Sequence, residues 1–415
     1  MDNKYDLIVV GAGASGIISA IISARDGKKV LILEKLSQIA SKLKATGGGR
    51  CNLTNTLSNS DFMNSFGKNG RFMQDALKEF DYKNLQLFFK EIGVETHAPD
   101  GFRIFPTSHS SVTIIKALQN EMDRLNIEIL LSQKVIKILQ EENSVTGVQT
   151  QNTIYKTSNI ILASGGLGYP TLGAEGDGYL ISKELGHSVS ELHPAMMPLN
   201  TKESWVNECR ADTISKVELK VDIKKHKKLH ANGDLIFTKK GIRGPVVLDF
   251  AREITPLLSK YDEVPLLLNL TKGMNEDEIL KHFKNEINKN QNINIIQLVK
   301  TILVESLSIQ ICKLADVDKD SKLNKIDGSS RAKLINLLAW TPLTIIGHDG
   351  FKMAMITRGG INLKEIDPKT MQSKIIKGLY FCGEIMNLDG PCGGYNLQWS
   401  FSSGYLAGLL NKNNG

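Results

Sequence analysis

The stretch YDLIVVGAGASGIISAIISARDGKKVLILEK, residues 5–35, decides the fold of this chain. Tyr5–Val10 is a short apolar run without alternation, which predicts a buried parallel strand. A G-x-G-x-x-G turn follows, and isoleucines then recur at helical spacing within residues 14–26, before Gly27. Because a second apolar run comes next at 29–33, the stretch predicts the first strand–helix–strand unit of a doubly wound α/β sheet.

The glycine turn has the residues that a phosphate site requires. Its three glycines permit, in order, a tight turn, close approach of the backbone to a pyrophosphate, and packing of the helix on the strand. The N-terminus of the helix supplies N–H donors and partial positive charge. Glu34 follows the second strand, where its carboxylate can accept a hydrogen bond from a ribose hydroxyl. The predicted dinucleotide contacts are Gly11, Gly13, Ala14, Ser15, Gly16, Glu34 and Lys35.

Composition limits the class of protein. The 415 residues, 41% of them hydrophobic, are enough for two or three globular domains. The five cysteines are widely spread and include no C-x-x-C pair, so we expect no disulfide framework, no metal site and a reducing cytoplasmic location. The glycine turn interrupts the N-terminal apolar stretch and no other run reaches about 18 apolar residues, so we expect no membrane span.

Further glycine-rich segments continue to the end of the chain. They read ATGGGRCNLTN at 45–55, LASGG at 162–166, FTKKGIRGP at 237–245, GLYFCGE at 378–384 and GGYNLQW at 393–399. Together with the first turn they resemble the HI0933-like FAD-dependent oxidoreductases, which belong to the flavoproteins with two dinucleotide-binding domains. Since the motifs span nearly the whole chain, the resemblance is specific.

The resemblance implies bound FAD and a set of contacts around it. The loop at 46–52 would lie beside the flavin ring, where Arg50 can hold phosphate oxygens as a fork. Val135 would meet the adenine side through its backbone, and Glu384 would bind the ribityl or pyrophosphate part. The further implied cofactor residues are Lys42, Thr46, Gly47, Gly48, Arg50, Cys51, Asn52, Val135, Ser164, Gly165, Gly166, Gly383, Glu384, Gly393, Gly394, Tyr395, Asn396 and Leu397.

The candidate catalytic residues are less well determined. Cys51, in the loop expected beside the flavin, is either a proton donor or a small packing residue. The other candidates lie in segments that can face the flavin, and they are Arg103, His109, His193 and Arg358. A lone histidine is more often structural than catalytic, so the sequence does not choose among them.

Flavin motifs at both ends of the chain make the FAD-binding domain discontinuous. We expect an α/β fold of the glutathione-reductase or fumarate-reductase type, with a Rossmann-like domain at 1–193 and 345–415 interrupted by an insert. The insert is expected to be β-rich at 194–273, where apolar residues alternate at 216–223, and helical at 274–344. The finer expectations are a strand at 132–138, a helix capped by Asp177, and helices starting at 275 and spanning 295–314 and 330–340.

The insert also carries the charge. Residues 216–243 contain nine Lys and Arg against three acids, a net of 9 − 3 = +6 out of +7 for the chain. This basic segment predicts either contact with an anionic partner, ribosomal RNA above all, or a solvated lysine-rich face.

The leading functional hypothesis is an FAD-dependent oxidoreductase that reduces an activated C=C bond by hydride transfer from flavin N5. NAD(P)H is the expected electron donor. Because the chain has a single G-x-G-x-x-G motif, NAD(P)H would dock transiently at the flavin face and not in a Rossmann domain of its own. The resemblance implies a uridine in ribosomal RNA or a steroid-like enone as substrate. It leaves open an amine oxidase that uses oxygen, similar to aminoacetone oxidases, and a non-catalytic FAD-binding module.

Overall fold

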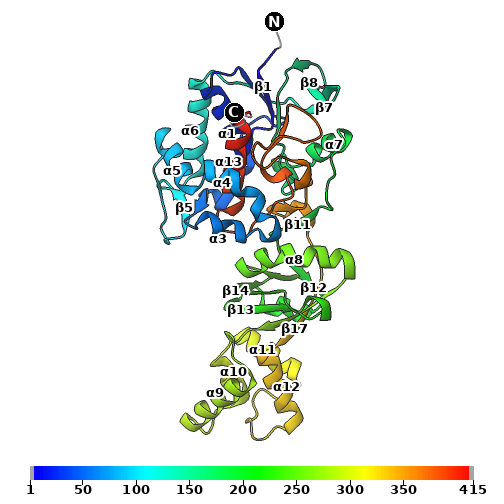
Figure 1. Cartoon of the computed structure of the whole chain (residues 1–415). Coiled ribbons are helices and arrows are strands. Elements are labelled where there is room, and N and C mark those ends of the chain that lie inside the picture. Colours follow the sequence, from blue (N-terminus) through cyan, green and yellow to red (C-terminus); the bar gives the residue numbers. More distant parts are fainter. Residues whose placement is uncertain (1–3, 411–415) are drawn as a thin grey trace. The chain divides into compact units, whose positions relative to one another are not determined.

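The computed structural model describes residues 4–410 and divides into two compact units (Figure 1). Unit 1 comprises Met1–His193 and Met355–Gly415, and unit 2 comprises Pro194–Ala354. Strand β11 (His193–Ala195) leads the chain out of unit 1, and β18 (Ile356–Arg358) follows its return. No helix within residues 4–410 combines the length and apolar character needed to cross a membrane.

Unit 1 is built on a parallel sheet with the strand order β19-β10-β1-β2-β6. These strands are Leu379–Phe381, Ile160–Leu162, Leu7–Val10, Val30–Leu33 and Glu128–Leu130, in that order. The central strands are buried, as their continuous apolar runs require. Parallel strands end at one edge, where Val10 pairs with Leu162 and Leu33, and Leu162 pairs with Phe381. The segments that follow β1, β10 and β19 therefore meet at this edge.

Helices and two small antiparallel sheets complete unit 1. In Figure 1, the first and last helices, α1 and α13, lie side by side. The helices are α1 Ala14–Arg25, α2 Ser41–Ala45, α3 Asn59–Asn64, α4 Gln74–Glu79, α5 Tyr82–Glu91, α6 Ser111–Arg124, α7 Asp177–Glu184 and α13 Tyr395–Gly408. The small sheets have the strand orders β3-β5-β4 (Thr54–Asn55, Arg103–Pro106, Thr96–His97) and β7-β8-β9 (Val135–Glu141, Ser144–Thr150, Ile154–Lys156). This arrangement confirms the predicted Rossmann-like α/β class.

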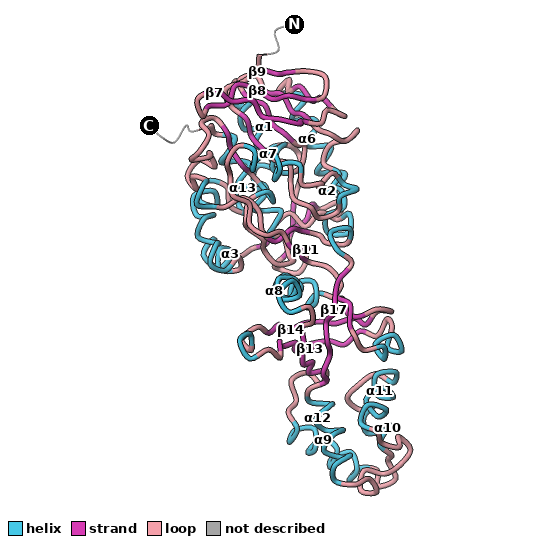
Figure 2. The backbone as a smooth tube through the Cα atoms, turned by 90° about the vertical axis from the view of Figure 1, so that its right-hand side faces the viewer, coloured by secondary structure: helices cyan, strands magenta, loops and turns pink. Residues whose placement is uncertain are grey.

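Unit 2 contains a closed barrel with the strand order β12-β15-β14-β13-β16-β17. In that order the strands are Leu199–Thr201, Gly241–Arg243, His230–Phe237, Thr213–Val221, Val264–Asn269 and Thr341–His348. The helices are α8 Pro245–Tyr261, α9 Glu276–Lys289, α10 Ile295–Lys300, α11 Glu305–Ala315 and α12 Gly328–Ala339. Figure 2 shows α8 on one side of the barrel strands and α9–α12 on the other. The β-rich and helical residues, expected at 194–273 and 274–344, share one hydrophobic core.

Several local expectations need correction. The helix expected at 295–314 is two helices, because the Thr301 hydroxyl donates to the Leu298 carbonyl oxygen and the chain is extended at Val304. Helix α8 occupies part of the stretch expected to be β-rich; Pro245 at its first turn and apolar residues at helical spacing were its signals. The strand expected at 132–138 is β7, which begins at Val135.

Asp177 does not cap α7. The helix begins after Gly176, whose left-handed backbone (φ 82°) leaves Asp177 as the first helical residue. The Asp177 carboxylate instead accepts hydrogen bonds from Lys35 at 2.6 Å and from Lys134 at 2.8 Å. A pairing between segments so far apart in the chain cannot be read from the sequence around 177.

Candidate functional site

The glycine turn after β1 packs on one side and is open on the other. A Cβ placed on Gly16 would lie 2.0 Å from the Gly11 carbonyl oxygen, so only glycine lets α1 approach β1 this closely. A Cβ placed on Gly13 would meet nothing within 4 Å. Gly13 is also the N-cap of α1 and offers no side-chain hydrogen bond to the first N–H groups of the helix. Open space and uncapped donors fit an anionic group at this end of α1.

Glu34 is fixed beside this turn. Its side chain accepts hydrogen bonds from the backbone N–H groups of Ala12 at 2.8 Å and Leu36 at 2.9 Å. Lys35, the next residue, pairs with Asp177 and Glu175. Burial alone would raise the pKa of Asp177, but hydrogen bonds from Lys134 and Lys35 outweigh burial and keep that pKa below its usual value. This end of the sheet therefore holds charged groups that suit the ribose side of a dinucleotide.

Helix α2, which precedes the loop at 46–52, and the segment after β19 meet through a salt bridge. Lys42 Nζ lies 2.6 Å from Glu384 Oε2, and the other Glu384 oxygen accepts a hydrogen bond from the Thr357 N–H at 2.9 Å. A Cβ placed on Gly166 would lie 2.6 Å from Glu384 Oε1, which explains the glycine after β10. The structure thus brings three of the predicted cofactor residues together, namely Lys42, Gly166 and Glu384. Sequence reasoning missed Thr357, although its neighbour Arg358 was a candidate, because the contact is made by the backbone N–H of Thr357.

The N-terminus of α13 contacts strand β3, which follows the loop at 46–52. Asn55 Nδ2 donates to the Gly393 carbonyl oxygen at 3.0 Å, and a Cβ placed on Gly394 would lie 2.5 Å from the backbone of Thr54. The N-cap Gly394 provides no side-chain hydrogen bond, so the first N–H groups of the helix remain uncapped by it. The Asn396 side chain accepts a hydrogen bond from the Gly390 N–H and donates one to the Gly390 carbonyl oxygen. Any cofactor contact made here is therefore mainly a backbone contact.

The remaining predicted cofactor residues lie on these same segments. Ser41, which sequence reasoning missed, has a buried hydroxyl without a partner among the described residues. Its neighbour Ala40 donates an N–H to the Ala12 carbonyl oxygen, which places the start of α2 beside the glycine turn. Ser164, at the end of β10, also has a buried hydroxyl without a partner in the described chain. Val135 begins β7 and is buried. Thr46–Gly49 form a tight turn in which Gly47 and Gly48 have a left-handed backbone (φ 62° and 66°). Gly383 follows β19, and Tyr395 packs on Phe62.

Cys51 does not have the environment of a reactive thiol. Its side chain is fully buried, and burial raises the pKa of the thiol to about 12. The thiol therefore stays protonated at neutral pH, so it is not a thiolate nucleophile. A group with so high a pKa also has little driving force to donate its proton. This environment favours the packing role over the proton-donor role.

The other catalytic candidates form two groups. His193 and Arg358 interact electrostatically. Burial lowers the pKa of His193, and the charge of Arg358 also lowers it. Glu191, at 3.6 Å from the His193 ring, raises this pKa but only partly offsets the other two effects. Arg358 itself lies 3.6 Å from Asp389. Arg103 and His109 lie elsewhere, around Phe105 in β5.

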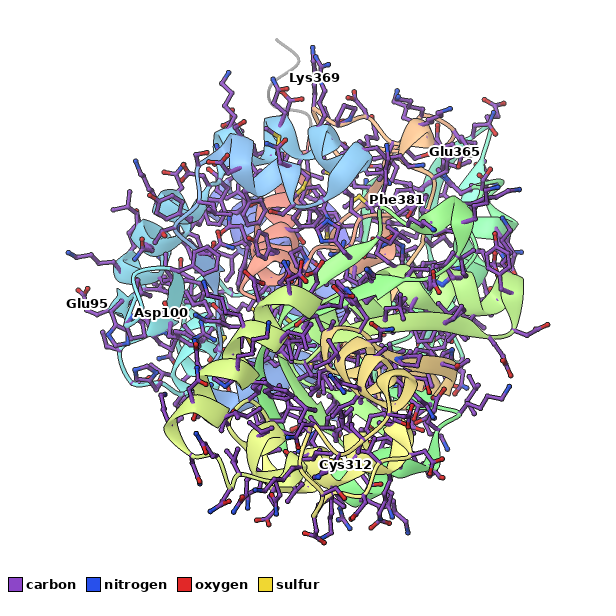
Figure 3. All side chains as sticks on the ribbon, turned by 90° about the horizontal axis from the view of Figure 1, so that it is seen from below. Glu95, Asp100, Cys312, Glu365, Lys369 and Phe381 are labelled. Carbon is purple, nitrogen blue, oxygen red and sulfur yellow. The ribbon has the colours of Figure 1, made fainter. Side chains whose placement is uncertain are left out.

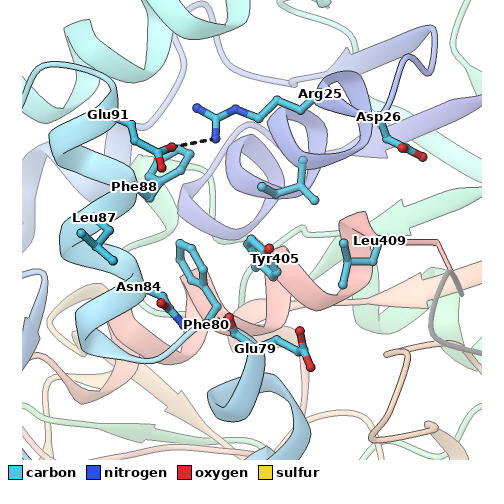
Figure 4. A pocket seen from close by; sticks show the side chains of 11 residues that line it. Arg25, Asp26, Glu79, Phe80, Asn84, Leu87, Phe88, Glu91, Tyr405 and Leu409 are labelled. Atoms are coloured by element: carbon cyan, nitrogen blue, oxygen red, sulfur yellow. Dashed lines mark hydrogen bonds and ion pairs between the residues drawn. The ribbon is translucent and has the colours of Figure 1, made fainter.

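A groove elsewhere in unit 1 does not belong to this site. It is lined by Ile22, Arg25 and Asp26 from the C-terminal end of α1, together with Phe80, Phe88 and Tyr405 (Figure 4). Arg25 points to Glu91 across it, at 3.2 Å. Because the glycine turn lies at the opposite end of α1, the groove is separate from the candidate dinucleotide site.

The sequence matches the family model described as the HI0933-like protein Rossmann domain over residues 5–410. The chain belongs to the HI0933-like family. The predicted family of FAD-dependent oxidoreductases is therefore confirmed. The uncapped helix N-termini, the open space at Gly13 and the unpartnered Ser41 hydroxyl fit FAD.

Two HI0933-like relatives match over nearly their whole length. The ribosomal RNA dihydrouridine synthase of Haemophilus influenzae is 30% identical over 416 residues, 99% of each chain. The 3-dehydro-bile acid delta(4,6)-reductase of Clostridium scindens is 29% identical over 403 residues, 96% of this chain and 97% of the relative. Among solved structures, the 3-ketosteroid delta1-dehydrogenase of Sterolibacterium denitrificans gives a TM-score of 0.53 at 12% identity, covering 98% of this chain and 99% of that one, which shows a shared fold.

This HI0933-like protein also contains a Ser–His–Glu arrangement in which the serine and the histidine are buried. His187 Nε2 lies 2.9 Å from the Ser373 hydroxyl, and His187 Nδ1 lies 3.2 Å from a Glu365 oxygen. The contacts follow the order of a hydrolytic triad, but Ser373 is buried and its hydroxyl also accepts two backbone N–H groups, from Ile375 and Ile376. The Ser373 hydroxyl is thus engaged with the backbone, and the arrangement joins the segment after α7 to the segment 365–376.

Substitutions in the glycine turn should separate folding from FAD binding. Gly13→Ala should leave the stability of the apoprotein nearly unchanged, since its Cβ enters open space, but should weaken FAD binding at least about tenfold. The matched Gly16→Ala should destabilise the apoprotein by about 1–3 kcal/mol, because its Cβ overlaps a carbonyl oxygen. Thermal unfolding of the apoprotein and fluorescence titration with FAD measure both effects. Unchanged FAD affinity in Gly13→Ala would contradict the assignment.

Protonation of His187 should destabilise unit 1. Burial lowers the pKa of His187 below its ordinary value of 6.5, so the folded chain binds this proton less well than the unfolded chain. The stability that neutral His187 provides is present above that ordinary value and is lost as the pH falls below it. His187→Gln should therefore flatten the decline of the unfolding free energy between pH 7 and 5, measured with urea. The exposed-residue control His230→Gln should keep the wild-type slope; equal slopes for all three proteins would refute the prediction.

Proposed function

We propose that this HI0933-like protein reduces a uridine in ribosomal RNA to dihydrouridine, with NAD(P)H as electron donor. The overall reaction adds two hydrogens across the activated C=C bond of the base, and NAD(P)H with one proton supplies them. FAD, when bound, supplies the hydride-transfer chemistry for this step. The chain's own residues bind the cofactor at the edge formed by β1, β10 and β19, and bind the substrate.

The observation that carries the proposal is an exposed lysine turn on unit 2. Strands β13 and β14 are joined by a short turn in which Lys224, Lys225, Lys227 and Lys228 are all exposed. Among the described residues these four lysines form no ion pair, so their charge is available to an anionic partner. The turn is held by His226, whose Nε2 lies 3.2 Å from the Tyr261 hydroxyl at the end of α8.

RNA accounts for this surface better than a small apolar substrate does. A polyanion gains affinity from each lysine through release of condensed counterions, whereas a steroid has no phosphate to bind. The relative named ribosomal RNA dihydrouridine synthase spans the whole chain, unit 2 included. A second candidate, reduction of a steroid-like enone, is supported by the Clostridium scindens relative, and it involves the same addition of hydrogen to an activated alkene.

The reaction itself is testable with the FAD-loaded protein. Incubation with unmodified ribosomal RNA and NADPH or NADH, without oxygen, should produce dihydrouridine that mass spectrometry detects in digested RNA. The same mixture with a 3-dehydro-bile acid tests the second candidate. Reduction of the enone without formation of dihydrouridine would replace the proposal by its alternative. Reduction of FAD by an amine alone, followed by peroxide formation in air, would favour an oxidase.

The lysine turn should determine the salt dependence of RNA binding. Replacing Lys224, Lys225, Lys227 and Lys228 with Gln should reduce the slope of log affinity against log salt concentration by up to about 3 to 4, with FAD content unchanged. The control carries the same loss of charge on the helical part of unit 2, at Lys281, Lys284, Lys313 and Lys333, all exposed. Fluorescence anisotropy with an RNA fragment measures the slopes. Equal slopes for both variants would show that the turn makes no specific contribution.

A further inference from the structure

A group of basic and aromatic side chains surrounds Phe105 in β5. The guanidinium carbons of Arg50 and Arg103 lie 5.7 Å and 6.0 Å from the centre of the Phe105 ring. The His109 ring lies 5.7 Å from the same ring, and His97 Nε2 lies 2.9 Å from His109 Nε2. We call these five residues the Phe105 cluster.

The Phe105 cluster borders the loop at 46–52. Phe105 Cε1 would lie 3.9 Å from a Cβ placed on Gly47, and the Leu53 N–H donates to the Ile104 carbonyl oxygen at 2.8 Å. Strand β3, which pairs with β5, also carries Asn55, whose side chain binds Gly393 before α13. The cluster is therefore built on the same small sheet that joins the two flavin-side segments.

The two arginines of the cluster present hydrogen-bond donors outward. Phe105 is only 4% exposed, whereas the Arg103 side chain is 49% exposed. A guanidinium that lies over an aromatic ring keeps its N–H groups free at its edge, in the geometry that binds phosphate oxygens. Among the described residues Arg50 forms no ion pair, and its side chain donates only to the Gly47 carbonyl oxygen of its own loop, at 3.4 Å.

Asp100 is the one carboxylate paired with the cluster in the described chain. Its Oδ2 accepts from Arg103 Nε at 2.6 Å, and its Oδ1 accepts from the backbone N–H groups of Phe102 and Arg103. Backbone and side-chain hydrogen bonds from Arg103 lower the pKa of Asp100 to about 2, so it remains charged. Asp100 thus occupies one edge of the Arg103 guanidinium and leaves the terminal N–H groups for another anion.

We propose that the Phe105 cluster is a phosphate-binding subsite for the ligand that reacts beside the loop at 46–52. Arg50 and Arg103 supply the charge, and Asp100 competes with the ligand phosphate for Arg103. The identity of that ligand rests on the proposed function, which offers two sources of phosphate: the RNA backbone next to the target base, and the 2′-phosphate that distinguishes NADPH from NADH.

The test compares substitutions with opposite effects on the same ion pair. Arg103→Gln removes the donor, and should weaken binding of the phosphate-bearing ligand about tenfold, as expected for a charge-assisted hydrogen bond. Asp100→Asn removes the competitor, and should leave that binding unchanged or strengthen it. Lys369→Gln is the charge control, since Lys369 is exposed and projects well apart from Asp100 in Figure 3.

The measurements use the FAD-loaded protein, and FAD content by absorbance should be the same in all variants. The affinity for a ribosomal RNA fragment, from fluorescence anisotropy, tests the RNA source. The KM for NADPH relative to NADH, from bleaching of the flavin without oxygen, tests the dinucleotide source. Weaker binding in Arg103→Gln alone, in either measurement, supports the subsite. The measurement in which it occurs identifies whether the phosphate belongs to RNA or to NADPH.

Two results would overturn the subsite. The first is wild-type affinity of Arg103→Gln for both ligands. The second is equal weakening of binding by Arg103→Gln and Asp100→Asn, which is the result expected of a purely structural ion pair. These results differ from failure of the proposed function, which appears in the wild-type protein as absence of dihydrouridine. In that case the dinucleotide arm still decides whether the Phe105 cluster binds phosphate.

Discussion

The architecture of unit 1 depends on how closely α1 approaches the backbone on both of its sides. Toward β1, Gly16 leaves no room for a Cβ beside the Gly11 carbonyl oxygen. Toward α13, a Cβ placed on Gly404 would lie 2.4 Å from the Ser15 carbonyl oxygen, and one on Gly408 would lie 2.6 Å from that of Ser19. Helix α1 is therefore held between the sheet and the last helix by contacts that only glycine permits.

This packing explains why residues from both ends of the chain meet at the candidate cofactor site. Because α13 lies directly against α1, its N-terminus is positioned relative to the glycine turn by backbone contact, and the Ser23 hydroxyl adds a 2.6 Å hydrogen bond to the Gly408 carbonyl oxygen. The Lys42–Glu384 salt bridge joins the same two ends at the edge of the sheet. A bulkier residue at Gly404 would therefore displace the N-terminal phosphate loop as well as the C-terminal helix.

Local chemistry made much of this site predictable from the sequence. Strand, glycine turn and helix at 5–26 follow from short-range rules, and so does the capping box of α9 at Asn275. Contacts between distant segments were not predictable. Examples are the ion pair of Asp177 with Lys35 and the hydrogen bond from the Thr357 backbone N–H to the Glu384 side chain. The spacing of Gly404 and Gly408, one small residue every fourth position on a helix, was a readable signal of close helix packing.

Two kinds of residue bear on the choice of substrate: the buried residues near the flavin motifs and the exposed basic residues. Near the flavin motifs, Cys51 keeps its proton with a pKa of about 12, which gives little driving force for donating it at neutral pH. The basic surfaces proposed to bind phosphate are the lysine turn of unit 2 and the Phe105 cluster of unit 1. Relatives named for a bile acid and for ribosomal RNA are 29% and 30% identical to this chain, so overall similarity does not separate the two substrates. If one flavin site serves both kinds of alkene, the charged surfaces that bind the rest of the substrate must make the choice.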